Sequence, residues 1–310
     1  MLNSYTRNLC GWLAGLLAAL NGAIASDVLP PADAATSRCL VCHETQHPAA
    51  VNGLRQSRHA GLVTAPAPFA ASGCTGCHGD SEAHMRPPAT GQLRAAADET
   101  FRSNSLAEIS RRNDRCLACH QSESARHWSG SRHDLGNVAC NDCHRIHAAT
   151  DPVMARESEN AVCFSCHQQQ RTDSLKPYTH PLQQGEMTCS ACHNPHGSFN
   201  TASLHGSQPT ETCYRCHAEK RGPFLWEHPP VREDCAVCHQ AHGSVHVGML
   251  KQRGPWLCQQ CHLSQYHPST AYSGTGLPPT PSSSVVGKNC LNCHAQIHGS
   301  NHPSGIRQIR

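Results

Sequence analysis

The chain has 310 residues and a formal net charge of only +3, and Leu, Ile, Val and Phe together make up about 15% of it. This share is too small for an ordinary side-chain core, yet the high net charge that normally accompanies disorder is missing. The composition therefore excludes an ordinary globular domain and predicts that something other than side chains forms the core.

The first 25 residues have the pattern of an export signal. Arg7 supplies the positive charge, an apolar run covers residues 9–20, and a small-residue Ala-x-Ala cleavage site follows. The apolar run is shorter than the roughly 20 residues that a membrane-spanning helix needs. We therefore expect residues 1–25 to be a signal peptide that takes Cys10 with it, and residues 26–310 to be the mature domain.

A five-residue motif, Cys-x-x-Cys-His, occurs ten times and uses twenty of the 21 cysteines. Two thiols at this spacing reach the two vinyl groups of a porphyrin, and the adjacent histidine ligates its iron. Zinc ribbons and dithiol redox pairs also use Cys-x-x-Cys, but neither requires the histidine. The pattern predicts ten covalently bound c-type haems, at Cys39/Cys42/His43, Cys74/Cys77/His78, Cys116/Cys119/His120, Cys140/Cys143/His144, Cys163/Cys166/His167, Cys189/Cys192/His193, Cys213/Cys216/His217, Cys235/Cys238/His239, Cys258/Cys261/His262 and Cys290/Cys293/His294.

A finer repeat joins the motifs in pairs. One histidine lies in the linker within each pair, and a second follows the second motif of the pair. This repeat selects ten candidate distal ligands, one for each iron: His59, His84, His133, His147, His180, His196, His228, His242, His267 and His298. Five histidines remain, and we expect them at the surface: His47, His127, His205, His246 and His302. His47 is an alternative to His59 or His84, and His127 to His133. The spacing does not assign a distal histidine to a given iron.

The four methionines of the mature chain stand at no repeated position, so bis-histidine ligation is expected at every iron. Histidine in place of methionine lowers a haem's reduction potential, which predicts a low-potential protein. Two axial ligands leave no iron open to a substrate. This argues against a multihaem reductase acting on nitrite, hydroxylamine or a sulfur oxyanion, which stays the alternative from another class.

The secondary structure is expected to be mostly loops and short α-helices wrapped around an extended chain of ten haems, with little or no β-sheet. Pro and Gly are frequent, at 21 and 23 residues. Ser105 and Glu108 form a capping-box pattern that predicts a helix over Leu106–Arg115. Segments 79–104 and 272–287 are predicted to be loops. Because ten porphyrins would replace the side-chain core, the apo-protein is expected to be largely unfolded.

The sequence resembles the MtrA/DmsE-type decahaem c-type cytochromes, which include the PioA-type proteins of iron oxidisers. The resemblance covers the mature chain in motif number, export signal and length, and its most specific stretch is residues 290–305. It implies the multihaem cytochrome c fold, and a periplasmic wire that inserts into an outer-membrane β-barrel porin. A division into two pentahaem halves, over residues 26–160 and 161–310, is the alternative to a single domain.

The leading hypothesis is an electron conduit associated with the outer membrane. The partners implied are the porin, an outer-surface multihaem cytochrome or terminal reductase, and a periplasmic or inner-membrane quinol-linked cytochrome. A freely diffusing periplasmic shuttle is a further alternative that differs by having no porin partner. No transmembrane segment is expected in the mature chain, and no basic patch with interleaved aromatic residues indicates a nucleic-acid partner.

Overall fold

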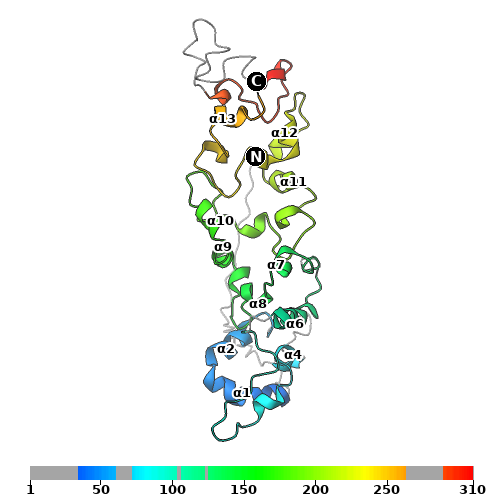
Figure 1. Cartoon of the computed structure of the whole chain (residues 1–310), viewed down its shortest axis with the longest axis vertical. Coiled ribbons are helices and arrows are strands. Elements are labelled where there is room, and N and C mark those ends of the chain that lie inside the picture. Colours follow the sequence, from blue (N-terminus) through cyan, green and yellow to red (C-terminus); the bar gives the residue numbers. More distant parts are fainter. Residues whose placement is uncertain (1–33, 61–71, 103–105, 123–124, 263–288, 310) are drawn as a thin grey trace, which may run out of the picture. The chain divides into compact units, whose positions relative to one another are not determined.

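In the computed structural model, the described residues all belong to one structural unit, Ala32–Arg310, and comprise 34–60, 72–102, 106–122, 125–262 and 289–309 (Figure 1). The predicted signal peptide, Cys10, His267 and the predicted loop 272–287 lie outside the described residues. The predicted division into pentahaem halves stays a prediction.

Every odd-numbered motif begins within an α-helix. Pro209 and Pro255 stand in the first turns of the helices at the seventh and ninth motifs, where the missing N–H of a proline removes no helical hydrogen bond. The helix at the first motif contains the whole motif, and the other four end at or just after the first cysteine. These helices are α1 (Ala34–Gln46), α6 (Leu106–Leu117), α9 (Arg156–Phe164), α11 (Pro209–Tyr214) and α13 (Gly254–Cys258).

Every even-numbered motif lies instead on a single short turn. Polar side chains cap two of these turns, because the carboxylate of Asp234 accepts from Ala236 N and the amide oxygen of Asn289 accepts from Leu291 N. The turns are the α-helical α4 (Thr75–His78) and α8 (Cys140–Cys143) and the 3-10 helices η2 (Cys189–Ala191), η5 (Cys235–Val237) and η8 (Cys290–Asn292).

The predicted helix over residues 106–115 is observed as α6. The loop prediction for residues 79–104 is wrong at one point, because α5 (Glu82–Met85) lies inside that segment. Arg94 donates to the carbonyl oxygen of His84 at 2.7 Å and thereby folds the rest of the segment back onto this turn. The other elements are α2 (Pro48–Gln56), α7 (Arg132–Leu135), α10 (Gln168–Asp173), α12 (Pro229–Glu233), η1 (Pro152–Met154), η3 (Thr201–Ser203), η4 (Ala218–Lys220), η6 (Val247–Met249) and η9 (Gly305–Arg307).

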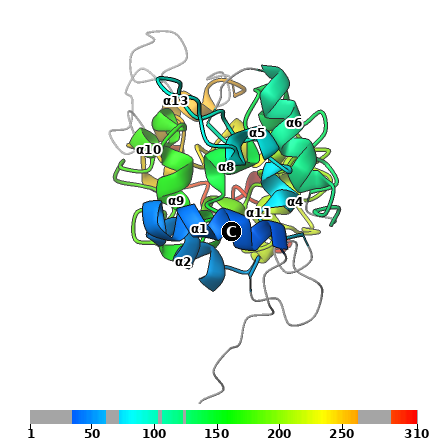
Figure 2. The ribbon, with the colours of Figure 1, turned by 90° about the horizontal axis from the view of Figure 1, so that it is seen from below.

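The described residues form no β-strand, and short helices separated by loops make up the ribbon in both views (Figures 1 and 2). Only isolated bridges occur among them. Two bridges, Tyr178 with Ser244 and Trp226 with Ser300, join segments that are distant in sequence. None of the described helices is long and apolar enough to cross a membrane. The longest of them, α1, has 13 residues, and a span needs about 20.

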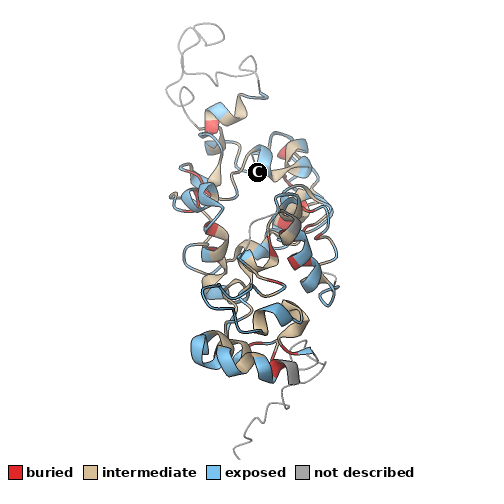
Figure 3. Ribbon diagram, turned by 60° about the horizontal axis from the view of Figure 1, so that its bottom comes forward, coloured by how far each residue is buried: buried red, intermediate tan, exposed pale blue. Residues whose placement is uncertain are grey.

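Buried side chains are few and scattered. Among the described residues the buried apolar side chains are limited to Ala60, Ile109, Trp128, Ala139 and Phe164. Figure 3 shows buried residues as isolated patches along the ribbon and not as one continuous core. A chain of this size normally buries a contiguous apolar core. The packing therefore agrees with a fold whose interior is supplied by a group other than side chains.

Candidate haem-attachment sites

Each motif is held as one helical turn. In the nine motifs from the second to the tenth, the backbone N–H of the histidine donates to the carbonyl oxygen of the first cysteine at 2.9–3.0 Å. Residues three and four apart lie on the same face of such a turn. Both thiols and the imidazole therefore project to one side, as attachment to one porphyrin edge and its iron requires.

Consecutive motifs lie next to each other along the chain. The first cysteines of the two motifs in a pair interact directly, as at Cys116 with Cys140 and at Cys163 with Cys189. Between pairs, the thiol of Cys143 interacts with that of Cys163. Burial raises the pKa of the Cys77 and Cys143 thiols, so they are held as neutral thiols before attachment. Porphyrins attached at successive motifs would therefore lie next to one another.

The twenty predicted haem-binding cysteines differ in exposure. Six second cysteines are exposed, whereas the other fourteen motif cysteines are half-buried. The exposed ones belong to the five odd-numbered motifs and to the tenth, and they are Cys42, Cys119, Cys166, Cys216, Cys261 and Cys293.

The contacts between motifs explain this exposure. The second cysteine of an even-numbered motif lies beside the motif that begins the next pair, as Cys77 lies beside Cys116 and Cys192 beside Cys213. Cys293, the second cysteine of the tenth motif, is exposed although that motif is even-numbered. In the odd-numbered motifs it is the first cysteine that packs within the pair. A thioether bond requires a thiol that reaches a vinyl group and not a buried one, so haem attachment stays the prediction for all six.

Buried polar residues at a fixed position connect the two motifs of a pair, and sequence reasoning missed them. They stand three residues before the first cysteine of an odd-numbered motif. Thr36 is fully buried and accepts from Cys74 N at 3.2 Å. The side chains of Asn113 and Asn160 accept from the backbone N–H groups of Cys140 and Cys189, both at 2.9 Å. The shared spacing is the signal that would have identified them.

Asn160 makes the largest number of these contacts, because its amide also donates to the carbonyl oxygens of Leu182 and Met187. We expect Asn160→Ala to lower the free energy of unfolding of the holo-protein by about 2–3 kcal/mol, since three partly buried backbone groups lose their partner. Denaturant titration followed by haem absorbance measures this loss. Asn52→Ala, at an exposed position of α2, is the control and is expected to change stability by less than about 0.5 kcal/mol. Equal losses of unfolding free energy in the two variants would contradict a stabilising role of the Asn160 hydrogen bonds.

Nine pairs of histidine rings face each other across a gap of nearly constant width. Each pair joins the histidine of a motif to one predicted distal histidine, with ring centroids 5.9–6.3 Å apart. An imidazole nitrogen lies about 2 Å from its metal and about 1.1 Å from its ring centroid, so two axial ligands of one iron have centroids about 6 Å apart. The pairs are His43–His84, His78–His147, His120–His59, His144–His196, His167–His133, His193–His242, His217–His180, His239–His298 and His262–His228.

The pairs interlock neighbouring repeats. From the second to the eighth motif, the histidine of an even-numbered motif faces the distal histidine that follows the next even-numbered motif, as His193 faces His242. From the third to the ninth motif, the histidine of an odd-numbered motif faces a distal histidine from the linker of the preceding pair, as His167 faces His133. An iron bound in this way would join two repeats that are dozens of residues apart.

The geometry bears on the alternatives that spacing left open. His59 faces His120, and His84 faces His43 with its Nδ1 2.7 Å from the carbonyl oxygen of Ala95. His47 also lies near His43, at 5.4 Å between centroids. The His43–His47 separation is shorter than any of the nine facing pairs, so His84 fits the opposite axial position better.

The other spare histidines have different surroundings. His127 packs its ring edge-on against Phe199 at 4.5 Å, while His133 takes the position opposite His167. His205 has its Nε2 2.9 Å from the carbonyl oxygen of Ser190, beside the sixth motif. His302 has its Nδ1 2.8 Å from the hydroxyl of Ser304. None of these three rings faces a motif histidine in the described pairs.

Hydrogen bonds at Nδ1 leave Nε2 of several of the paired rings free for a metal. The Nδ1 atoms of His193 and His239 lie 2.7 and 2.8 Å from the carbonyl oxygens of Ala202 and Gly248, so each Nδ1–H donates. Among the distal rings, burial lowers the pKa of His242, with the nearby His193 as a further cause. Burial likewise lowers the pKa of His147, His196, His228 and His298. A neutral imidazole is the form that ligates a metal.

A glycine follows three of the distal histidines because the backbone there is left-handed and crowded. Gly197, Gly243 and Gly299 have φ of +106°, +136° and +131°. A Cβ atom on Gly243 would overlap with the carbonyl oxygen of Asp173. A residue with a side chain is disfavoured at such φ values. The glycine thus allows the distal segment to approach the neighbouring repeat closely.

We expect Gly243→Ala to lower the free energy of unfolding by about 3 kcal/mol or more, because backbone strain and overlap with Asp173 add together. The matched control is Gly185→Ala, which has φ of +71° but open space around the added methyl group. Backbone strain alone predicts a loss of about 1 kcal/mol there. Denaturant titration of both holo-proteins makes the comparison. A smaller loss of unfolding free energy at Gly243 than at Gly185 would show that the close approach of Gly243 to Asp173 does not contribute to stability.

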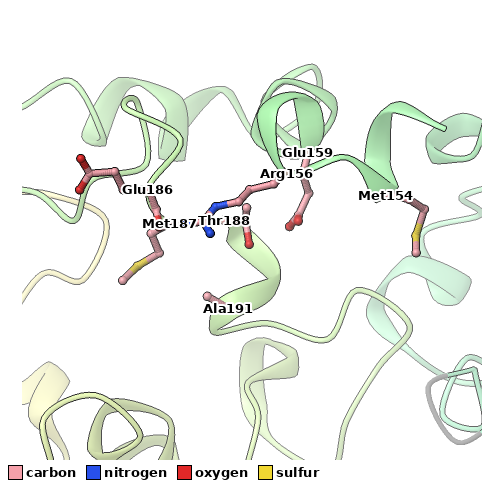
Figure 4. Close-up of a pocket in the computed structure, with 7 residues that line it drawn as sticks. All are labelled: Met154, Arg156, Glu159, Glu186, Met187, Thr188 and Ala191. Carbon is pink, nitrogen blue, oxygen red and sulfur yellow. Dashed lines mark hydrogen bonds between the residues drawn. The ribbon is translucent and has the colours of Figure 1, made fainter. Parts of the chain in front are cut away.

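A hollow of about 420 Å³ lies beside the sixth motif (Figure 4). Two of its charged side chains are engaged with that motif and its neighbours. The carboxylate of Glu159 accepts from the N–H and the hydroxyl of Ser190, and Arg156 donates to the carbonyl oxygen of Gly185. The hollow is therefore part of the support of a motif. Its lining residues are Met154, Arg156, Glu159, Glu186, Met187, Thr188 and Ala191.

Comparisons with known proteins agree with this arrangement. The doubled CXXCH motif family matches residues 180–222 and 228–266, and the family described as cytochrome c-type protein NrfB-like matches residues 74–160. The chain is 45% identical to the multiheme cytochrome MtrA of Shewanella baltica over 270 residues, which cover 86% of this chain and 79% of that protein. The chain belongs to the MtrA family of multihaem cytochromes.

Membership of the MtrA family confirms the predicted multihaem cytochrome c fold of loops and short helices, and the covalent binding of haem c. It also makes the chain an electron-transfer protein and not an enzyme, as the sequence predicted. A second relative, the cytochrome c-type protein NrfB of Haemophilus influenzae, is 26% identical over 102 residues. That match covers 32% of this chain and 45% of NrfB, so it is narrower than the match to MtrA.

Proposed function

We propose that this MtrA-family chain binds ten c-type haems, one at each Cys-x-x-Cys-His motif, and that every iron has two histidine ligands. The observation that carries the proposal is the near-constant 5.9–6.3 Å separation of the nine facing rings. The nine distal histidines in those pairs are the distal ligands that we assign. By elimination, His267 is assigned to His294, the motif histidine whose distal partner is still unassigned.

When bound, haem supplies a one-electron centre at each site. The side chains would fix where these centres lie. The cysteines would hold each porphyrin at its motif, and the paired imidazoles would ligate its iron, from two different repeats at the second to the ninth motifs. Saturated axial ligation also keeps substrates away from the irons. Because successive motifs are in contact, the protein places ten redox centres in an unbroken series.

The proposed role is an electron conduit between the periplasm and a partner at the outer membrane. Its support is the series of contacting sites, the relation to MtrA and the export-signal pattern of residues 1–25. A membrane-spanning partner, an outer-membrane β-barrel porin, would carry the chain across the bilayer. On the far side, an outer-surface multihaem cytochrome or terminal reductase exchanges electrons with it. On the near side, the exchange is with a periplasmic or inner-membrane quinol-linked cytochrome.

The test has two parts. Intact mass spectrometry of the exported protein is expected to show ten covalently attached haems, with residues 1–25 removed. Vesicles that contain the porin–cytochrome complex and an enclosed redox dye are then expected to reduce the dye when an electron donor is added outside. Vesicles with the porin alone are the control. Dye reduction that needs only the soluble cytochrome, without any porin, would favour the shuttle alternative.

A further inference from the structure

One motif histidine differs from the others in the group that accepts its second ring proton. His78, His193, His239 and His294 each have Nδ1 within 2.7–3.0 Å of a backbone carbonyl oxygen. His144, in the fourth motif, has Nδ1 2.7 Å from the carboxylate oxygen Oδ2 of Asp151. His217 also has a carboxylate nearby, but the Glu219 oxygen is 3.9 Å away, beyond hydrogen-bonding distance.

The distal rings follow the carbonyl pattern. The Nδ1 atoms of His84, His133 and His180 lie 2.7–3.0 Å from the carbonyl oxygens of Ala95, Pro195 and Ala241. Among the described histidines with a hydrogen bond at Nδ1 to another part of the chain, His144 is therefore the exception. The difference is one of charge, because a carbonyl oxygen is a neutral acceptor and a carboxylate is an anionic one.

The backbone fixes the orientation of the Asp151 carboxylate. Its second oxygen, Oδ1, accepts from Arg145 N at 3.1 Å and from Val153 N at 3.4 Å, where Asp151 caps η1. The side chains of His144 and Asp151 are 27% and 20% exposed. Partial burial strengthens a hydrogen bond relative to one in water. Oδ2 is thus held in line with the ring of His144 by contacts that do not involve the ring.

We propose that Asp151 lowers the reduction potential of the haem at the fourth motif. A carboxylate that accepts from Nδ1–H draws the proton towards itself and makes the imidazole a stronger electron donor at Nε2. A stronger donor stabilises ferric over ferrous iron, and hydrogen bonding beyond the direct ligands is a known means of tuning haem potential. Asp151 acts through His144, so it is a positioning and tuning residue that does not contact the iron.

The consequence would fall on a haem held at the fourth motif. That haem would be harder to reduce than the same haem with a neutral acceptor beside its ligand, so an electron would accumulate there less readily. The carboxylate also acts electrostatically on the ring of His59, the ligand assigned to the third haem, but without a hydrogen bond to it. The inference rests on the proposed function, because it requires a haem at the fourth motif with His144 as ligand.

The test is Asp151→Asn in the full-length, haem-loaded protein. The amide oxygen retains an acceptor for His144, but the charge is gone. Redox titration followed by absorbance is expected to move about a tenth of the haem signal to higher potential. The expected change is about tenfold in the reduction equilibrium constant, equivalent to about 59 mV for one electron. The ferric paramagnetic resonance spectrum is expected to show one low-spin signal with altered g-values.

The matched control is Asp234→Asn. Asp234 also caps a short helix beside a motif, accepting from Ala236 N at 2.8 Å, and no hydrogen bond joins it to an imidazole in the described residues. A shift in the Asp151 variant that the control does not show supports the inference. Equal shifts in both variants, or none in either while ten haems are retained, overturn it.

Mass spectrometry separates this inference from the proposed function. A wild-type protein without haem at the fourth motif would refute the proposed ligation itself. If instead only the Asp151→Asn variant incorporates fewer than ten haems, the paramagnetic resonance spectrum of the wild-type protein tests the inference. One of its low-spin signals must then show the smaller g-value spread of an imidazole with imidazolate character. A spectrum in which every signal has the spread of a carbonyl-bonded imidazole overturns the inference.

Discussion

Removal of the haems is expected to unfold the described unit almost completely. The described residues bury five apolar side chains, scattered over the chain, and such a set cannot offset a conformational entropy cost of roughly 1–2 kcal/mol per residue. The polypeptide should therefore be stable only around its porphyrins. Chain produced without haem attachment is expected to lose most of its helical circular dichroism and to show no cooperative thermal transition.

The comparison requires the same chain with and without maturation, so that haem is the only difference. Expression in the cytoplasm without the signal peptide supplies the apo-protein, and exported protein supplies the holo-protein. Size-exclusion chromatography with light scattering is expected to show a much larger radius for the apo-protein. A cooperative unfolding transition in the apo-protein would refute the view that the cofactors form the core.

Replacement of His242 by alanine is expected to open the iron at the sixth motif. His242 lies 6.0 Å from His193 between centroids, and burial keeps its ring neutral by lowering its pKa. Loss of this ligand should convert about a tenth of the ferric haem to high spin. It should also free the repeat that contains the eighth motif from the one that contains the sixth, at a cost of at least about 3 kcal/mol in unfolding free energy.

His246→Ala is the matched control, because His246 lies four residues further on, is half-buried and faces no motif histidine among the described pairs. The control is expected to keep every iron low-spin. Paramagnetic resonance of the oxidised proteins gives the spin states, and electron flux through the porin complex is expected to fall about tenfold or more in the His242 variant only. High-spin iron in the control but not in His242→Ala would show that His246, and not His242, is the distal ligand.

The local chemistry of the sites was predictable because the two cysteines and the histidine of each site lie within five consecutive residues. One helical turn determines the relative positions of Cys189, Cys192 and His193, so the motif alone predicts attachment. The family resemblance was predictable for the same reason, since ten such motifs occupy the whole mature chain. The scarcity of strands and the short helices followed from composition. Family membership confirms the resemblance, and the short helices, with no strand among the described residues, confirm the predicted secondary structure. Attachment at each individual motif stays a prediction.

The partners of the motifs were not predictable from spacing. His193 faces His242 and not His196, although His196 is only three residues away. His196 instead faces the histidine of another motif, His144, at 6.0 Å between ring centroids. Asn160 was missed for a related reason, since the groups that it contacts, at Leu182, Met187 and Cys189, come from the next segment of the chain.

The sequence by itself determined the number of Cys-x-x-Cys-His motifs, the set of candidate axial ligands and the family. Only the tertiary structure decided which ring faces which, which motif thiols are exposed, that each facing pair from the second motif to the ninth joins two repeats, and that Asp151 contacts His144. The physical reason is the range of the interactions. Covalent attachment is specified within one helical turn, whereas an axial pair is completed across loops whose return path depends on contacts throughout the unit.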